Sequence, residues 1–73
     1  MVNDSTTLFI VAPDVSNEAL ITNSYETFSS VSTLLLDLSE ELSGKHRDMA
    51  LAIHQLSELG TLLAAQLLDR SPG

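Results

Sequence analysis

The chain has 73 residues, of which 44% are apolar and none is cysteine, and its formal net charge is −7. This length allows one domain with a marginal core, and the lack of cysteine excludes disulfides and thiolate metal sites. We therefore expect self-association or partner binding to supply the missing stability. Excess carboxylate repels phosphate backbones and anionic lipid headgroups, and no apolar run approaches the roughly 20 residues that span a bilayer. We therefore expect a cytoplasmic protein that binds neither nucleic acid nor membranes.

The chain opens with a polar, flexible N-terminus at residues 1–7, followed by an apolar run at residues 8–12 that Pro13 ends. The β-branched and aromatic side chains of this run favour a short strand or extended arm. A single strand leaves its backbone hydrogen-bonding groups unpaired. We therefore expect the run to pair with a second copy, to join the sheet of a partner, or to lie extended over helices.

The first helix is predicted over residues 16–43, with Ser16 as its N-terminal cap. Its apolar residues recur at helical spacing and form one stripe. Small side chains at Ser24, Ser32 and Ser39 lie on or near that stripe and allow another helix to approach closely. The stripe consists of Ile21, Tyr25, Phe28, Val31, Leu35, Leu38 and Leu42, widened by Leu20 and Leu36.

Gly44 follows this stripe and is suited to the left-handed conformation in which many helices end. The second helix is predicted over residues 45–69, with a tail at 70–73. A short connection between long helices makes them antiparallel neighbours. The predicted fold class is therefore all-α, a long helical hairpin within a single domain.

The second predicted helix carries a long apolar face, on which Ala52 and Gly60 are points of close backbone approach. Leu51 and Leu62 form a second apolar patch on another side. Two faces exceed what one neighbouring helix can cover, so we predict a homodimer of hairpins that forms a four-helix bundle. The predicted interface combines the stripe of the first helix with Leu8, Ile10, Met49, Ile53, Leu56, Leu59, Gly60, Leu63 and Leu67.

Residues with catalytic chemistry are few, and no arrangement among them is specific. His54 and Glu58 lie one turn apart and can face a metal together, but one pair supplies only two ligands, so a hydrogen-bonded surface pair is the favoured interpretation. Lys45, His46 and Arg47 are interpreted as complements to the negative end of the first helix. Nucleophile elbows and phosphate-binding glycine loops are absent. We expect no catalytic site, no metal and no cofactor.

Several strings of residues resemble a family of small bacterial proteins classed only as a domain of unknown function. The first is Leu8-Phe9-Ile10-Val11-Ala12-Pro13-Asp14, a few residues before Glu18-Ala19-Leu20. The later part is similar to the second helix of that family in Leu42-Ser43-Gly44, Arg47, Leu51-Ala52-Ile53, Gln55, Leu59-Gly60 and Leu68-Asp69, although Lys45 stands where proline is often seen. The resemblance covers about residues 7 to 70. It implies a helical, non-enzymatic accessory protein and transfers no site residues.

Excess apolar surface without catalytic groups predicts a small homodimeric protein-interaction module, such as a regulator or adaptor. The alternative is an acidic inhibitor that binds a basic or nucleic-acid-binding partner protein, because its carboxylates imitate the charge of nucleic acid. A small-molecule binder or enzyme that uses the bundle interior would require a cavity lined by polar groups.

Overall fold

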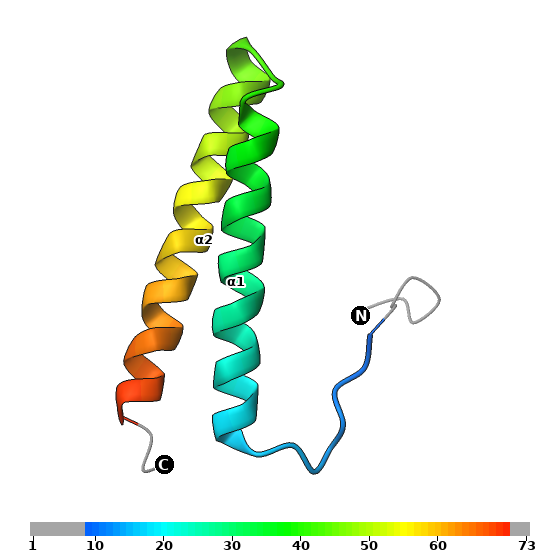
Figure 1. Cartoon of the computed structure of the whole chain (residues 1–73), viewed down its shortest axis with the longest axis vertical. Coiled ribbons are helices and arrows are strands. Elements are labelled where there is room, and N and C mark those ends of the chain that lie inside the picture. Colours follow the sequence, from blue (N-terminus) through cyan, green and yellow to red (C-terminus); the bar gives the residue numbers. More distant parts are fainter. Residues whose placement is uncertain (1–8, 71–73) are drawn as a thin grey trace.

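The computed structural model describes residues 9–70, which form two helices joined by a short turn (Figure 1). Helix α1 spans Asn17–Ser39 and helix α2 spans Gly44–Arg70. The helices run antiparallel and pack against each other, and the described residues contain no strand. The predicted all-α helical hairpin is confirmed, while its pairing into a four-helix bundle stays a prediction.

Helix α1 begins at the predicted serine cap. Ser16 has extended backbone angles, and its Oγ accepts a hydrogen bond from the backbone N–H of Ala19 at 3.1 Å. This bond pairs one of the amide groups that the start of a helix leaves free, and Glu18 places negative charge in the positive first turn. Ser16 therefore sets the point at which the extended chain becomes helical.

Helix α1 ends at Ser39, although the apolar pattern predicted a helix to residue 43. The backbone N–H groups of Glu40, Glu41 and Leu42 donate to carbonyl groups three residues earlier, which is the tighter winding common at helix ends. Two neighbouring carboxylates are also unfavourable at the negative end of a helix. The predicted end was wrong because it followed the apolar residue Leu42 and gave no weight to the two acids before it.

Gly44 has a φ angle of 57°, in the left-handed conformation predicted for it. An added Cβ at this position would meet no atom within 4 Å, so the preference for glycine comes from the backbone conformation alone. Gly44 opens α2, which therefore starts one residue before and ends one residue after the predicted range 45–69.

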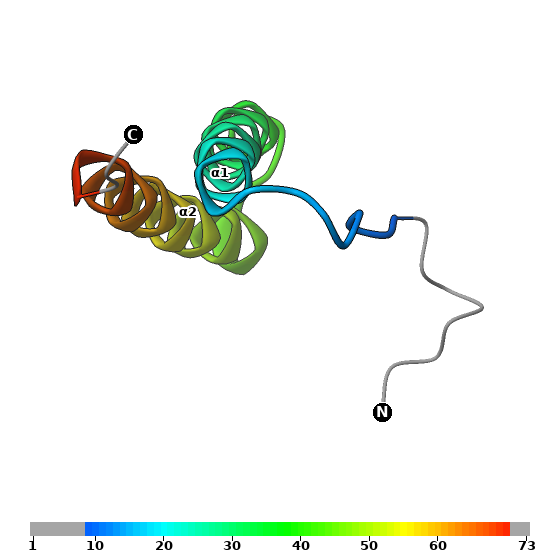
Figure 2. The same cartoon turned by 90° about the horizontal axis from the view of Figure 1, so that it is seen from below.

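Residues 9–12 form an extended arm that leaves the hairpin and does not lie over the helices (Figures 1 and 2). Phe9 and Ile10 are 84% and 94% exposed. The alternative in which the run lies extended over its own helices is therefore wrong. A strand does not form within one chain because the arm meets no neighbouring backbone with which to pair. Leu8 lies outside the described residues, and pairing with a second copy stays a prediction.

The contact between the two helices is a seam of small side chains. On α2, Ala50, Ser57 and Ala64 recur every seven residues and are 4%, 5% and 5% exposed. On α1, Ser32 and Ser39 are buried in the same way. Small residues at such a contact let the two backbones approach closely. No large apolar side chain among residues 9–70 is buried, so the hairpin alone lacks an ordinary hydrophobic core.

Gly60 marks the closest approach between an aromatic ring and the helix backbone. A Cβ built on Gly60 would lie 2.7 Å from Cδ1 of Phe28 and 2.9 Å from its Cγ. The predicted close approach at Gly60 is confirmed, whereas Ala52, for which the same role was predicted, is exposed in the single hairpin.

The substitution Gly60→Ala tests this contact. Alanine favours a helix interior over glycine by about 1 kcal/mol, but the added methyl group would overlap the Phe28 ring, and such overpacking costs about 1–3 kcal/mol. We expect the free energy of unfolding to fall, measured by urea denaturation with far-UV circular dichroism at one protein concentration. In a Phe28→Leu background the same change should be neutral or stabilising, and a gain in stability in the native background would contradict the contact.

Candidate functional site

The hairpin has two broad faces, one on each side of the seam. Phe28 and Gly60 meet on one side. On the other side, Ser29 and Thr33 of α1 and Thr61 of α2 line a common groove. Residues of one helix that are three, four or seven apart share a side, so these contacts assign the other positions to a face.

The side of Phe28 and Gly60 is here called the apolar face. It comprises Leu20, Phe28, Val31, Leu35 and Leu38 of α1, Leu42 of the connection, and Met49, Ile53, Leu56, Gly60, Leu63 and Leu67 of α2. Leu35, Leu42 and Gly60 are half-buried. The other nine residues are large and 37–66% exposed. Most of the interface predicted from the sequence therefore lies together on one side of the hairpin.

The remaining predicted interface residues lie elsewhere. Ile21 and Tyr25 are at the seam, half-buried and 38% exposed respectively. Leu59 is 50% exposed at the outer edge of α2. Ile10 belongs to the arm, away from the apolar face.

Charged residues are absent from the middle of the apolar face. Helix α1 has no charged residue between Glu26 and Asp37. Between Asp48 and Asp69, α2 has only Glu58, and that side chain lines the groove on the opposite side. An uncharged surface with this many exposed large side chains is typical of a protein–protein contact site.

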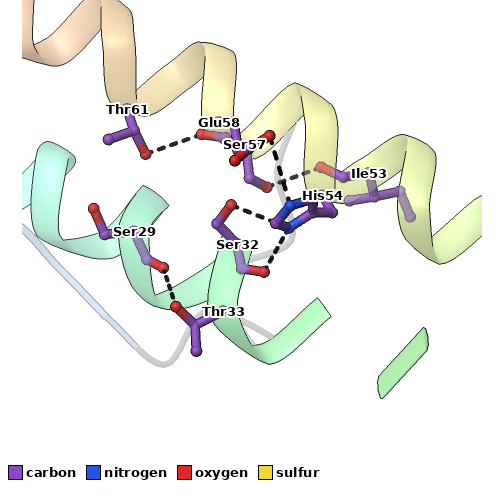
Figure 3. Close-up of polar contacts among 8 residues, drawn as sticks. All are labelled: Ser29, Ser32, Thr33, Ile53, His54, Ser57, Glu58 and Thr61. Atoms are coloured by element: carbon purple, nitrogen blue, oxygen red, sulfur yellow. Dashed lines mark hydrogen bonds and ion pairs between the residues drawn. The ribbon is translucent and has the colours of Figure 1, made fainter. Parts of the chain in front are cut away.

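The opposite side is here called the groove face. A shallow groove with a volume of about 440 Å³ runs between the helices, lined by Ser29, Ser32, Thr33, Glu58, Thr61 and Leu62. Figure 3 draws all of these side chains except Leu62. A second hollow next to it shares Ser29 and Thr33 and adds Ser30 and Leu34. The groove therefore combines hydroxyl groups and one carboxylate with leucine side chains.

His54 joins the two helices beside this groove (Figure 3). Its Nδ1 lies 2.7 Å from the backbone carbonyl oxygen of Ser32 and 3.2 Å from Ser32 Oγ. A carbonyl oxygen only accepts hydrogen bonds, so Nδ1 carries a proton and donates it to Ser32. Nε2 lies 3.6 Å from Glu58 Oε1, so the two side chains are neighbours as predicted, but this distance is longer than a hydrogen bond and the predicted hydrogen-bonded pair does not form.

The threonine hydroxyls of the groove are oriented by their own helices. Thr33 Oγ1 donates to the carbonyl oxygen of Ser29, and Thr61 Oγ1 donates to that of Ser57, each at 3.1 Å. Because each hydroxyl proton is used within its helix, the threonine oxygens present lone pairs. They remain able to accept hydrogen bonds from a bound group.

A family of unknown function, DUF6124, matches residues 8–70. The chain belongs to this family. The matched range includes the arm and both helices, in agreement with the resemblance found in the sequence. No curated protein and no solved structure matches the chain.

The structure of this DUF6124 hairpin also bears on metal sites and on membrane spans. Within residues 9–70, no group of three or more His, Asp or Glu side chains is placed to hold a metal ion. Neither helix of the described part is apolar enough over a sufficient length to cross a bilayer.

The basic cluster Lys45, His46 and Arg47 is exposed in the first turn of α2.

The close approach predicted at Ser32 and Ser39 is confirmed, whereas Ser24 is exposed. The α2 half of the seam and the groove were missed. The seven-residue repeat of Ala50, Ser57 and Ala64 is visible in the sequence, but a search for large apolar residues passes over it. The contact of His54 with Ser32 has no comparable signal, because the two residues lie 22 positions apart and meet only once the helices pair.

Replacing His54 with alanine should destabilise this DUF6124 chain. The change removes a hydrogen bond between helices, and losing a bond of this kind costs about 1–3 kcal/mol. His46→Ala is the matched control, because His46 is exposed near the turn and its loss should change stability by no more than about 0.5 kcal/mol. Chemical denaturation of both variants measures the difference, and equal stabilities would show that the His54 bond contributes nothing.

Proposed function

We propose that the chain is a small, non-enzymatic, homodimeric protein-interaction module, and that the apolar face pairs with the same face of a second copy. One observation carries this proposal: only two alanines and three serines are buried among residues 9–70, while nine large apolar residues of one face are 37–66% exposed. A helical hairpin with its larger side chains outside its own contact requires cover from another chain.

Burying the apolar face against a second copy provides enough free energy for the two copies to associate. Full burial of a large apolar side chain contributes about 1.5–3 kcal/mol, so each half-exposed one contributes roughly 1 kcal/mol. Two copies bring nine such residues each. The total is comparable to or above the ~4–15 kcal/mol that association costs in lost freedom of motion. A two-fold axis makes the contact self-complementary, and the product is a four-helix bundle.

The arm is a further apolar element for the second copy to cover. Phe9, Ile10 and Val11 are 84%, 94% and 68% exposed. Pairing two arms across the dimer axis would satisfy backbone groups that one chain leaves to water. Such a two-stranded pair is marginal alone, so it depends on the bundle beneath it.

A second candidate function, an acidic inhibitor of a basic partner, is favoured by the positions of the carboxylates. Glu26, Asp37 and Glu40 share the stripe of Ser29 and Thr33 on α1, and so lie on the groove face. Pairing through the apolar face leaves this acidic side pointing outward. Capture of a basic or nucleic-acid-binding protein that weakens steeply with added salt would support this role, and capture that does not change with salt would reject it.

The pairing of apolar faces is tested by a matched pair of substitutions. Leu56 lies on the apolar face and Leu62 on the groove face. In the single hairpin the two side chains are 66% and 64% exposed, so an aspartate would be almost equally exposed to solvent at either site. We expect the native chain and Leu62→Asp to have twice the chain mass at micromolar concentration. Leu56→Asp should be monomeric, because its carboxylate would be buried without a partner charge.

Light scattering and sedimentation measure these masses. A native chain that stays a folded monomer would refute the proposed dimer. A dimer that Leu62→Asp breaks and Leu56→Asp leaves intact would place the contact on the groove face instead. Helicity measured on the same samples shows that a change in mass does not come from unfolding.

A further inference from the structure

The groove face holds a pair of polar atoms that lack a donor between them. His54 Nδ1 carries its proton toward Ser32, so in the neutral ring Nε2 is a hydrogen-bond acceptor. Oε1 of Glu58 lies 3.6 Å from Nε2 and is also an acceptor. Two acceptors at this separation can both be satisfied by one N–H group that enters from the groove.

The two threonine hydroxyls of the groove also present acceptors. Thr33 Oγ1 and Thr61 Oγ1 spend their protons on their own helices and offer only lone pairs, as Figure 3 shows. Leu62 and the threonine methyl groups supply apolar surface beside them. Hence the groove suits a group with several donors, a positive charge and an aliphatic stem.

We propose that this groove binds an arginine side chain presented by a partner protein. The planar guanidinium has five N–H donors and no acceptor, and it can donate to Glu58 and to His54 Nε2 at once. Its three-carbon stem packs on Leu62 while the charged head stays near solvent. A lysine ammonium carries the same charge but lacks the planar fork that reaches two acceptors side by side.

The inference rests on the proposed role of the chain as a protein-interaction module, since it names the chemistry of the partner. It does not rest on the dimer. The groove face and the apolar face are opposite sides of the hairpin, so arginine binding and pairing of copies occupy different residues. Their tests can therefore fail independently.

The probe is N-acetyl-arginine N-methylamide, titrated into the full-length, ¹⁵N-labelled chain at fixed ionic strength with EDTA present to remove divalent metals. We expect saturable amide shifts confined to Ser29, Thr33, His54, Glu58 and Thr61. The citrulline analogue has the same shape without the charge and should bind at least about five-fold more weakly, as expected for loss of one exposed charged hydrogen bond. Equal binding of the citrulline compound would overturn the proposal.

Two variants and one control locate the site. Glu58→Gln should weaken binding about five-fold, while Glu41→Gln makes the same change of charge in the turn and should leave binding unchanged. Thr61→Val keeps the side-chain shape without the acceptor oxygen and should also weaken binding. Equal effects of the two glutamine variants, or shifts spread over all carboxylates, would show that only net charge attracts the probe.

Ring ¹⁵N shifts of His54 give a separate readout. We expect Nδ1 to be protonated and Nε2 to have a free lone pair before the probe is added, with Nε2 shifting on binding. An imidazolium ring in the free protein would overturn the proposal, because Glu58 would then already have its donor. A Leu56→Asp chain that is monomeric and keeps its helicity should bind the probe as the native chain does, so a native chain that proves to be a folded monomer would leave this result intact.

Discussion

The whole arrangement depends on the close approach of two backbones along the seam. Ala50, Ser57 and Ala64 of α2 and Ser32 and Ser39 of α1 are all buried where the helices meet, and side chains this small allow little lateral space between the helices. Large side chains then have no room at the centre and are displaced to the sides. The exposed leucines of the apolar face are therefore a direct consequence of the contact that holds the hairpin together.

A seam of alanine and serine contributes little burial of apolar area, and its repeated small residues would tolerate sliding of one helix along the other. The His54 bond to the Ser32 carbonyl opposes such sliding. A shift of one turn would move the imidazole away from Ser32 and leave it half-buried without its acceptor, which is unfavourable. Gly60 under the Phe28 ring adds a steric restriction on the opposite side of the seam. One polar and one steric contact thus select a single register.

The parts of the fold that the sequence predicts are those set by local chemistry. Ser16 caps α1 because its hydroxyl meets an amide three residues away, and Gly44 takes a left-handed conformation that other residues rarely adopt. The apolar pattern extends α1 to Leu42, whereas the acidic residues before Leu42 are unfavourable at the negative end of a helix. A search for apolar periodicity does not include that second effect. The apolar stripes lie mostly together on one side of the hairpin, but their largest residues do not make the contact between the helices. That contact belongs to small residues, of which the sequence indicated Ser32 and Ser39 on α1 only. The polar contact of His54 with Ser32 joins positions that no local pattern connects.

The apolar face and the groove face lie on opposite sides of the hairpin, which limits how many grooves of a dimer one partner could reach. In a two-fold dimer formed through the apolar faces, the two groove faces lie on the outside and point away from each other. A partner with one arginine segment would meet two equivalent and independent sites, whereas a partner with two such segments would need to reach around the bundle to use both. Because the helices are rigid and the grooves lie on opposite sides, short bivalent partners cannot engage both grooves of one dimer. They would instead bridge neighbouring dimers, so the spacing of basic segments in a partner decides between simple occupancy and cross-linking.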